Sequence, residues 1–103
     1  MINIFSKEQI INIKLVLGQC IVYINGIMLI TGTSNQCMSK IRSVIKNTSY
    51  SLLNDNIIKF NIESEIISAE TANDRSYFIN QIRLLSTCCK CKIEIKAGIH
   101  YIG

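Results

Sequence analysis

The sequence contains no proline and no tryptophan, and it has no run of about 18 apolar residues, the length that a membrane-spanning helix needs. Lys14, Gln19 and Asn25 interrupt its most hydrophobic part, so no transmembrane segment is predicted. Because the first residues lack a basic region followed by an apolar core, we expect no secretory signal peptide. The missing residue types, together with abundant isoleucine, asparagine and lysine, indicate an AT-rich coding sequence, so residue counts alone say little about function.

The sequence also lacks the motifs on which most catalytic and cofactor sites depend. No glycine-rich phosphate loop occurs, because Gly18, Gly26 and Gly32 have the spacing of turns between strands. No serine or cysteine lies in a nucleophile motif, and His100 is the only histidine. We therefore expect a non-enzymatic protein that uses no cofactor.

The residues that are present suffice for a hydrophobic core. The chain has 103 residues, of which 49% are hydrophobic, and a chain of this length buries roughly two-thirds of its unfolded surface. We predict one α+β domain over 1–103, with two or three helices packed on one face of a small mixed sheet. The net charge of +4 is a mild excess, which a solvated surface explains as well as an anionic partner does.

The five cysteines, an odd number, are not typical of a disulfide framework. Cys88, Cys89, Cys91 and His100 have the residue types that bind zinc, but no second cysteine pair lies at a matching spacing. Alternation places Cys89 and Cys91 on the apolar face of a predicted strand. We therefore predict packed thiols rather than a metal site, with Cys88 the most exposed of the three.

The clearest local signal is a β-hairpin over 20–32. Two apolar runs rich in β-branched residues are separated by Asn25-Gly26, the dipeptide that best serves a two-residue turn with positive φ at both positions. Asn25, Gly26 and Gly32 are therefore predicted to be structural turn residues.

Residues 6–17 fit two patterns. Ser6 and Gln9 have capping-box spacing, and Ile10, Ile13 and Leu17 form a helical stripe. Alternating apolar residues over 11–17 fit a strand equally well.

The remaining elements follow from periodicity and turn residues. Thr33 and Gln36 form a capping-box pair before a helix over 34–46. Further elements are expected as a strand at 58–62 with a return strand at 66–69, a helix at 71–87, a strand at 89–97, and a turn at Gly98 into 99–102.

Lys90, Lys92 and Lys96 share the polar face of the last strand. They form a possible interaction face. One interpretation is a surface for nucleic acid, and the other is protection of an edge strand against unwanted pairing.

The hairpin and the helix after it resemble the BON domain, in which an Asn-Gly or Asp-Gly turn precedes a strand of the pattern Gly-x-Val-x-Leu-x-Gly. Gly26, Met28, Ile30 and Gly32 occupy the four pattern positions, and the resemblance covers 6–62. It implies an α-β-β-α-β order, which favours a helix at 6–17, and leaves 63–103 as a helix and a C-terminal strand hairpin. Similar ring-building modules occur in inner-membrane ring proteins of bacterial type III secretion systems.

Two functions follow as hypotheses. The resemblance implies a protein–protein interaction and assembly module that self-associates or binds other subunits of a membrane-associated assembly, on the periplasmic side of the bacterial inner membrane. The alternative is a small cytoplasmic regulator that binds nucleic acid through Lys90, Lys92 and Lys96. Nucleic-acid binding of that kind would weaken steeply with salt.

Overall fold

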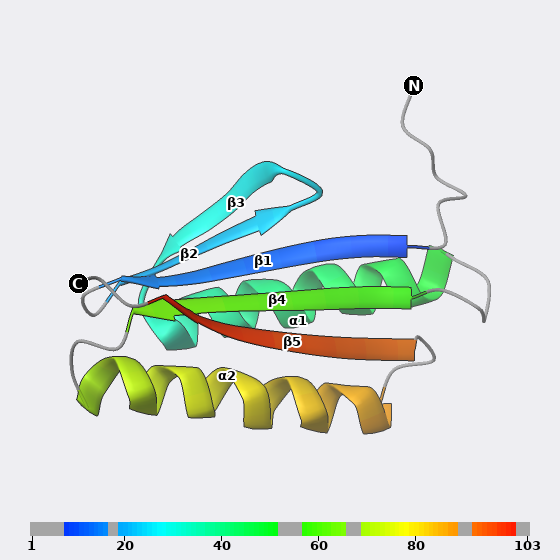
Figure 1. The fold of residues 1–103 in the computed structure, drawn as a ribbon. Coiled ribbons are helices and arrows are strands. Elements are labelled where there is room, and N and C mark those ends of the chain that lie inside the picture. Colours follow the sequence, from blue (N-terminus) through cyan, green and yellow to red (C-terminus); the bar gives the residue numbers. More distant parts are fainter. Residues whose placement is uncertain (1–7, 17–18, 52–56, 66–68, 89–91, 101–103) are drawn as a thin grey trace.

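The computed structural model describes residues 8–16, 19–51, 57–65, 69–88 and 92–100, and it describes the backbone alone at 47–51, 65, 88, 99 and 100. Five strands and two helices lie in these ranges (Figure 1). In chain order they are β1 (Glu8–Val16), β2 (Gln19–Ile24), β3 (Ile27–Gly32), α1 (Ser34–Ser51), β4 (Ile57–Glu65), α2 (Ala69–Cys88) and β5 (Lys92–His100). The predicted α+β class is confirmed.

The strands form one mixed sheet in the order β3-β2-β1-β4-β5. β2 is antiparallel to both of its neighbours, whereas β4 is parallel to β1 and to β5. β1 is therefore the central strand, with the hairpin on one side and the two parallel strands on the other. Parallel neighbours need long crossover connections, and these contain α1 and α2.

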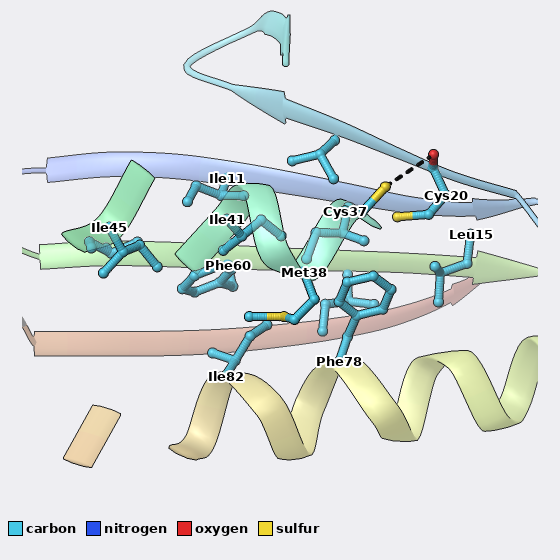
Figure 2. Close-up of a cluster of buried hydrophobic side chains, with 14 residues drawn as sticks. Ile11, Leu15, Cys20, Cys37, Met38, Ile41, Ile45, Phe60, Phe78 and Ile82 are labelled. Carbon is cyan, nitrogen blue, oxygen red and sulfur yellow. Dashed lines mark hydrogen bonds between the residues drawn. The ribbon is translucent and has the colours of Figure 1, made fainter. Parts of the chain in front are cut away.

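Both helices cover the same face of the sheet, because their buried residues join one cluster with one face of the strands (Figure 2). Phe60, at the middle of β4, and Phe78 of α2 are completely buried in this cluster. The buried core consists of Ile11, Ile13, Leu15, Cys20, Val22, Cys37, Met38, Ile41, Ile45, Ile58, Phe60, Ile62, Phe78 and Ile82. No described element covers the opposite face of the sheet, which is called the open face below.

The first described element is a strand, so the helix that the resemblance implied at 6–17 is wrong, and with it the α-β-β-α-β order. Ile11, Ile13 and Leu15 are buried at every second position, which a helix cannot achieve. Ile10, which would lie on the helical stripe, faces the open side and is 36% exposed. The order over 8–65 is instead β-β-β-α-β.

Two predicted hairpins in the second half are also wrong. β4 has β1 on one side and β5 on the other, so neither side is left for a return strand at 66–69. Ala69 begins α2, and 66–68 lie outside the described residues. Gly98 does not turn the chain, because it lies within β5 opposite Glu63 of β4. The pairing with a long parallel neighbour keeps the strand extended through the glycine.

The start of α1 has the predicted capping box. The backbone N–H of Gln36 donates to Oγ1 of Thr33 at 3.3 Å, and the N–H of Thr33 donates to Oε1 of Gln36 at 3.0 Å. A Cβ at Gly32 would lie 2.5 Å from Oε1 of Gln36, so the glycine leaves room for this cap. Neither described helix is long and apolar enough to cross a membrane.

Candidate functional site

The two edges of the sheet differ in charge. β3, at one edge, has the sequence IMLITG and carries no charged side chain. Ile27 is 71% exposed and Met28 is 58% exposed on this strand. β5, at the other edge, alternates Lys92, Glu94 and Lys96 with apolar residues, and all three charged side chains are exposed. Charged side chains are a common protection against edge-to-edge pairing, and β5 carries them whereas β3 does not. The pairing of β3 with β2 shifts register at Leu29, so the edge of β3 has one irregularity there.

The turn before β3 is fixed by Asn25 and Gly26. Both residues have positive φ, 49° for Asn25 and 84° for Gly26, as a tight two-residue hairpin turn requires. The backbone N–H of Asn25 donates to the carbonyl of Ile10 at 2.8 Å, and Oδ1 of Asn25 accepts the Ile10 N–H at 2.9 Å. The Nδ2 of Asn25 also donates to Oε1 of Gln9 at 2.6 Å. The turn is thereby joined to β1, which holds the start of β3 in place.

A shallow groove of about 500 Å³ lies between the β3 edge and α1. It is on the helix-covered side of the sheet, because Ile30 both lines it and packs partly against the core. The other lining residues come from the solvent-facing side of α1: Asn35, Gln36, Ser39, Lys40 and Ser43. The groove therefore combines one apolar side chain of the edge strand with polar groups and one cation.

The net positive charge of the protein comes from one part of the chain. Residues 9–54 contain four lysines and arginines and no aspartate or glutamate, whereas the rest of the chain contains seven of each sign (11 − 4 and 7 − 0). The net charge of +4 therefore comes entirely from the segment that forms most of β1, β2, β3 and α1. The cations in this segment are Lys14, Lys40, Arg42 and Lys46.

The cations of α1 and β1 differ in their surroundings. Arg42 donates a hydrogen bond to Oε1 of Gln81 on α2, and the Nζ of Lys14 lies 5.3 Å from the ring centroid of Tyr23. Lys40 and Lys46 are exposed on α1. No hydrogen bond or ion pair to another described residue is found for either of them.

The lysine face predicted on the last strand is mixed in charge where the structure describes it. Lys92 and Lys96 alternate with Glu94, and the Nζ of Lys92 lies 3.8 Å from Oε2 of Glu94. Charges of both signs also meet on the neighbouring strands, where Lys59 of β4 forms a 2.9 Å ion pair with Glu8 of β1. Lys90 lies outside the described residues. Acidic and basic side chains are therefore mixed on this face, and it is not a concentrated basic patch.

Two thiols that the sequence analysis did not single out meet inside the core. The Sγ of Cys37, on α1, donates to the carbonyl of Cys20, on β2, at 3.5 Å (Figure 2). Burial raises the pKa of both thiols, so both are held in the neutral, unreactive form. Cys89 and Cys91 lie outside the described residues, and nothing is described of the side chains of Cys88 and His100. Among the described side chains, no group of three potential metal ligands occurs.

Sequence reasoning located the hairpin but did not identify its second strand as an exposed, uncharged edge of the sheet. Whether a strand lies at an edge depends on which strands pair, and the hairpin alone does not determine this. Two signals were nevertheless visible, the uncharged run at 27–32 and the absence of acidic residues over 9–54.

The chain matches no protein-family model, no curated protein and no solved structure.

Proposed function

We propose that the protein is a non-enzymatic protein–protein interaction module that accepts a strand of a partner protein at β3. The observation that carries this proposal is the contrast between the two sheet edges. β3 is uncharged and exposes Ile27 and Met28, whereas β5 carries Lys92, Glu94 and Lys96.

An edge strand has backbone N–H and C=O groups that no neighbouring strand pairs. A partner segment in extended conformation satisfies them, so main-chain hydrogen bonds supply affinity and alternate side chains supply specificity. β3 has six residues, enough for a short ladder, and the groove beside Ile30 lies where alternate side chains of an added strand would fall.

This function agrees with the assembly role that the resemblance implied, but it rests on the sheet edge and not on the resemblance. Membership of a membrane-associated ring and a periplasmic location remain predictions. The nucleic-acid alternative is less well supported, because acidic side chains alternate with Lys59, Lys92 and Lys96 on the open face.

Self-association of the purified protein tests whether β3 accepts a strand. Two copies that pair through β3 would bring together two positively charged α1 helices, so we expect dimers to increase with protein concentration and with salt, which screens like charges. Sedimentation velocity at low and high salt measures this. Nucleic-acid binding depends on salt in the opposite sense.

Met28→Lys places a charge on the edge strand and should abolish the dimer, while circular dichroism shows an unchanged fold. Leu84→Lys is the matched control, because Leu84 is 60% exposed on α2, away from β3. A dimer that persists in Met28→Lys, or a wild-type protein that neither dimerises nor binds an extended peptide, would overturn β3 as the accepting edge.

A further inference from the structure

We infer that the strand added at β3 comes from a different protein and is acidic on the side that faces α1. This inference rests on the proposed function and names the chemistry of the partner. It combines three observations: the uncharged edge, the groove lined by Lys40, and the absence of acidic residues over 9–54.

Strand geometry divides the side chains of the added segment into two sets. Side chains alternate between the two faces of a sheet. The pairing of β3 with β2 shifts register at Leu29, so Met28 and Ile30 lie on opposite faces although they are two residues apart. One set therefore falls beside Met28 on the open face, and the other falls beside Ile30 in the groove against α1. Only the second set comes near Lys40.

Lys40 is the cation of α1 that lines the groove. Lys46 lies six residues further along α1, which is roughly 120° around the helix from Lys40, so it does not face the same strand. It lies instead closer to the side of Arg42, which bonds Gln81 on α2. One carboxylate on the groove side of an added strand can therefore pair with Lys40.

A second copy of the chain is the less suitable occupant. A copy that pairs through its own β3 brings a second Lys40 to the junction and offers no acidic residue between 9 and 54. Like charges at an interface oppose binding, whereas opposite charges raise both the association rate and the specificity. The charge distribution therefore favours an acidic partner over self-pairing at physiological salt.

Binding of synthetic peptides tests this inference. The probe is a capped, fluorescently labelled peptide of alternating valine and glutamate, as long as β3, which has six residues. Peptides with glutamine or lysine in place of glutamate are the matched controls. Fluorescence anisotropy should show that the glutamate peptide binds roughly threefold to fivefold more tightly than the glutamine peptide, as one exposed ion pair with Lys40 would give. The lysine peptide should bind most weakly.

Lys40→Glu should remove the preference for the glutamate peptide and leave binding of the glutamine peptide in place. Lys96→Glu makes the same charge change on the opposite edge strand and should leave the preference unchanged. Both side chains are exposed, so both variants should fold. Added salt should reduce the preference, because it screens the ion pair.

The outcomes separate this inference from the proposed function. Equal binding of the glutamate and glutamine peptides, both sensitive to Met28→Lys, would overturn the acidic partner and leave strand addition standing. A preference that survives Lys40→Glu would also overturn the inference. Tighter binding of a single-stranded oligonucleotide that competes with the peptide would overturn both, in favour of nucleic acid. Failure of every peptide, together with a monomer at high salt, would likewise overturn both.

Discussion

Asn25 performs two tasks that few other residues combine. It adopts a left-handed backbone conformation with φ of 49°, and its side chain bonds both the Ile10 N–H and the Gln9 side chain of β1. Asparagine tolerates this conformation better than most residues, because its short polar side chain forms local hydrogen bonds. The residue thereby couples the turn of the hairpin to the central strand.

Asn25→Ala should lower the free energy of unfolding by about 2 kcal/mol, through the lost side-chain bonds and the cost of positive φ for alanine. Asn25→Gly removes the same bonds but tolerates the backbone conformation, so it should cost less. Urea denaturation measures both values. Equal stability of the alanine variant and the wild type would show that the turn does not depend on Asn25.

The paired thiols of Cys20 and Cys37 should make stability sensitive to alkaline pH. An unfolded thiol ionises near its ordinary pKa of 9.0, but burial raises the pKa of both thiols in the folded protein. Below that pH both states keep their protons, so stability does not change. Above it the unfolded state loses protons that the folded state retains, and the free energy of unfolding falls as pH rises.

Urea denaturation of the reduced protein across this pH range measures the slope. Cys20→Ala removes one of the two thiols and should make the slope shallower, although it also lowers stability at neutral pH by leaving a small cavity. An unchanged slope in Cys20→Ala would contradict the assignment. Native Cys20 and Cys37 should also react slowly with thiol reagents until denaturant is added, because both are buried.

At the scale of elements, α1 has the most sharply divided surface. Ile41 is completely buried against the sheet, while Ser39 lies on the solvent-facing side of the same helix. Ile41→Asp should cost on the order of 4 kcal/mol or more, since a charge would be placed in the core without a partner. Thermal denaturation followed by circular dichroism should show an unfolded or strongly destabilised chain.

Ser39→Asp is the control on the exposed side of α1 and should change stability by less than about 0.5 kcal/mol. A strongly destabilised Ser39→Asp variant, or a stable Ile41→Asp variant, would show that the helix faces are misassigned. Ile30→Asp should be less damaging than Ile41→Asp, because Ile30 lies at the sheet edge and is only partly buried.

The elements that the sequence predicted well are those with local signals. Asn25-Gly26 determines a turn through its own backbone preferences, and Thr33 with Gln36 caps α1 through bonds within one helical turn. β1 was ambiguous because its isoleucines fit both periods, and only pairing with β2 and β4 on either side selects the strand. Such pairing involves residues far apart in the chain, so no local pattern reveals it.

Pairing between distant segments also explains why the sequence did not predict the course of the chain at Gly98 or the position of the proposed site. A glycine followed by apolar residues is typical of a turn, yet parallel pairing with β4 carries β5 through it. The edge position of β3 also depends on the complete strand order. The charge asymmetry between 9–54 and the rest could be read from the sequence, but the position of Lys40 beside an open edge could not.

For the whole molecule, the central pairing of β1 with β4 joins segments separated by two strands and a helix. Such non-local contacts slow folding, because the intervening chain must be ordered before the contacts form. The sequence has no proline, and a slow phase of roughly 10–100 s at 25 °C in refolding usually arises from proline isomerisation.

Stopped-flow refolding of the reduced protein should therefore proceed in milliseconds to seconds without a later slow phase. Dilution from urea, followed by tyrosine fluorescence, measures this. A phase in the range of tens of seconds that does not depend on protein concentration would contradict the expectation. A phase that accelerates with concentration would instead report association.

The unequal protection of the two edges has a consequence for stoichiometry. If a strand adds at β3 while Lys92, Glu94 and Lys96 keep β5 from pairing, each molecule has one acceptor edge and no complementary donor edge. Head-to-tail growth into a fibre needs both. Complexes formed through this sheet should therefore contain one partner strand per molecule. Binding should saturate at a one-to-one ratio however much partner is present.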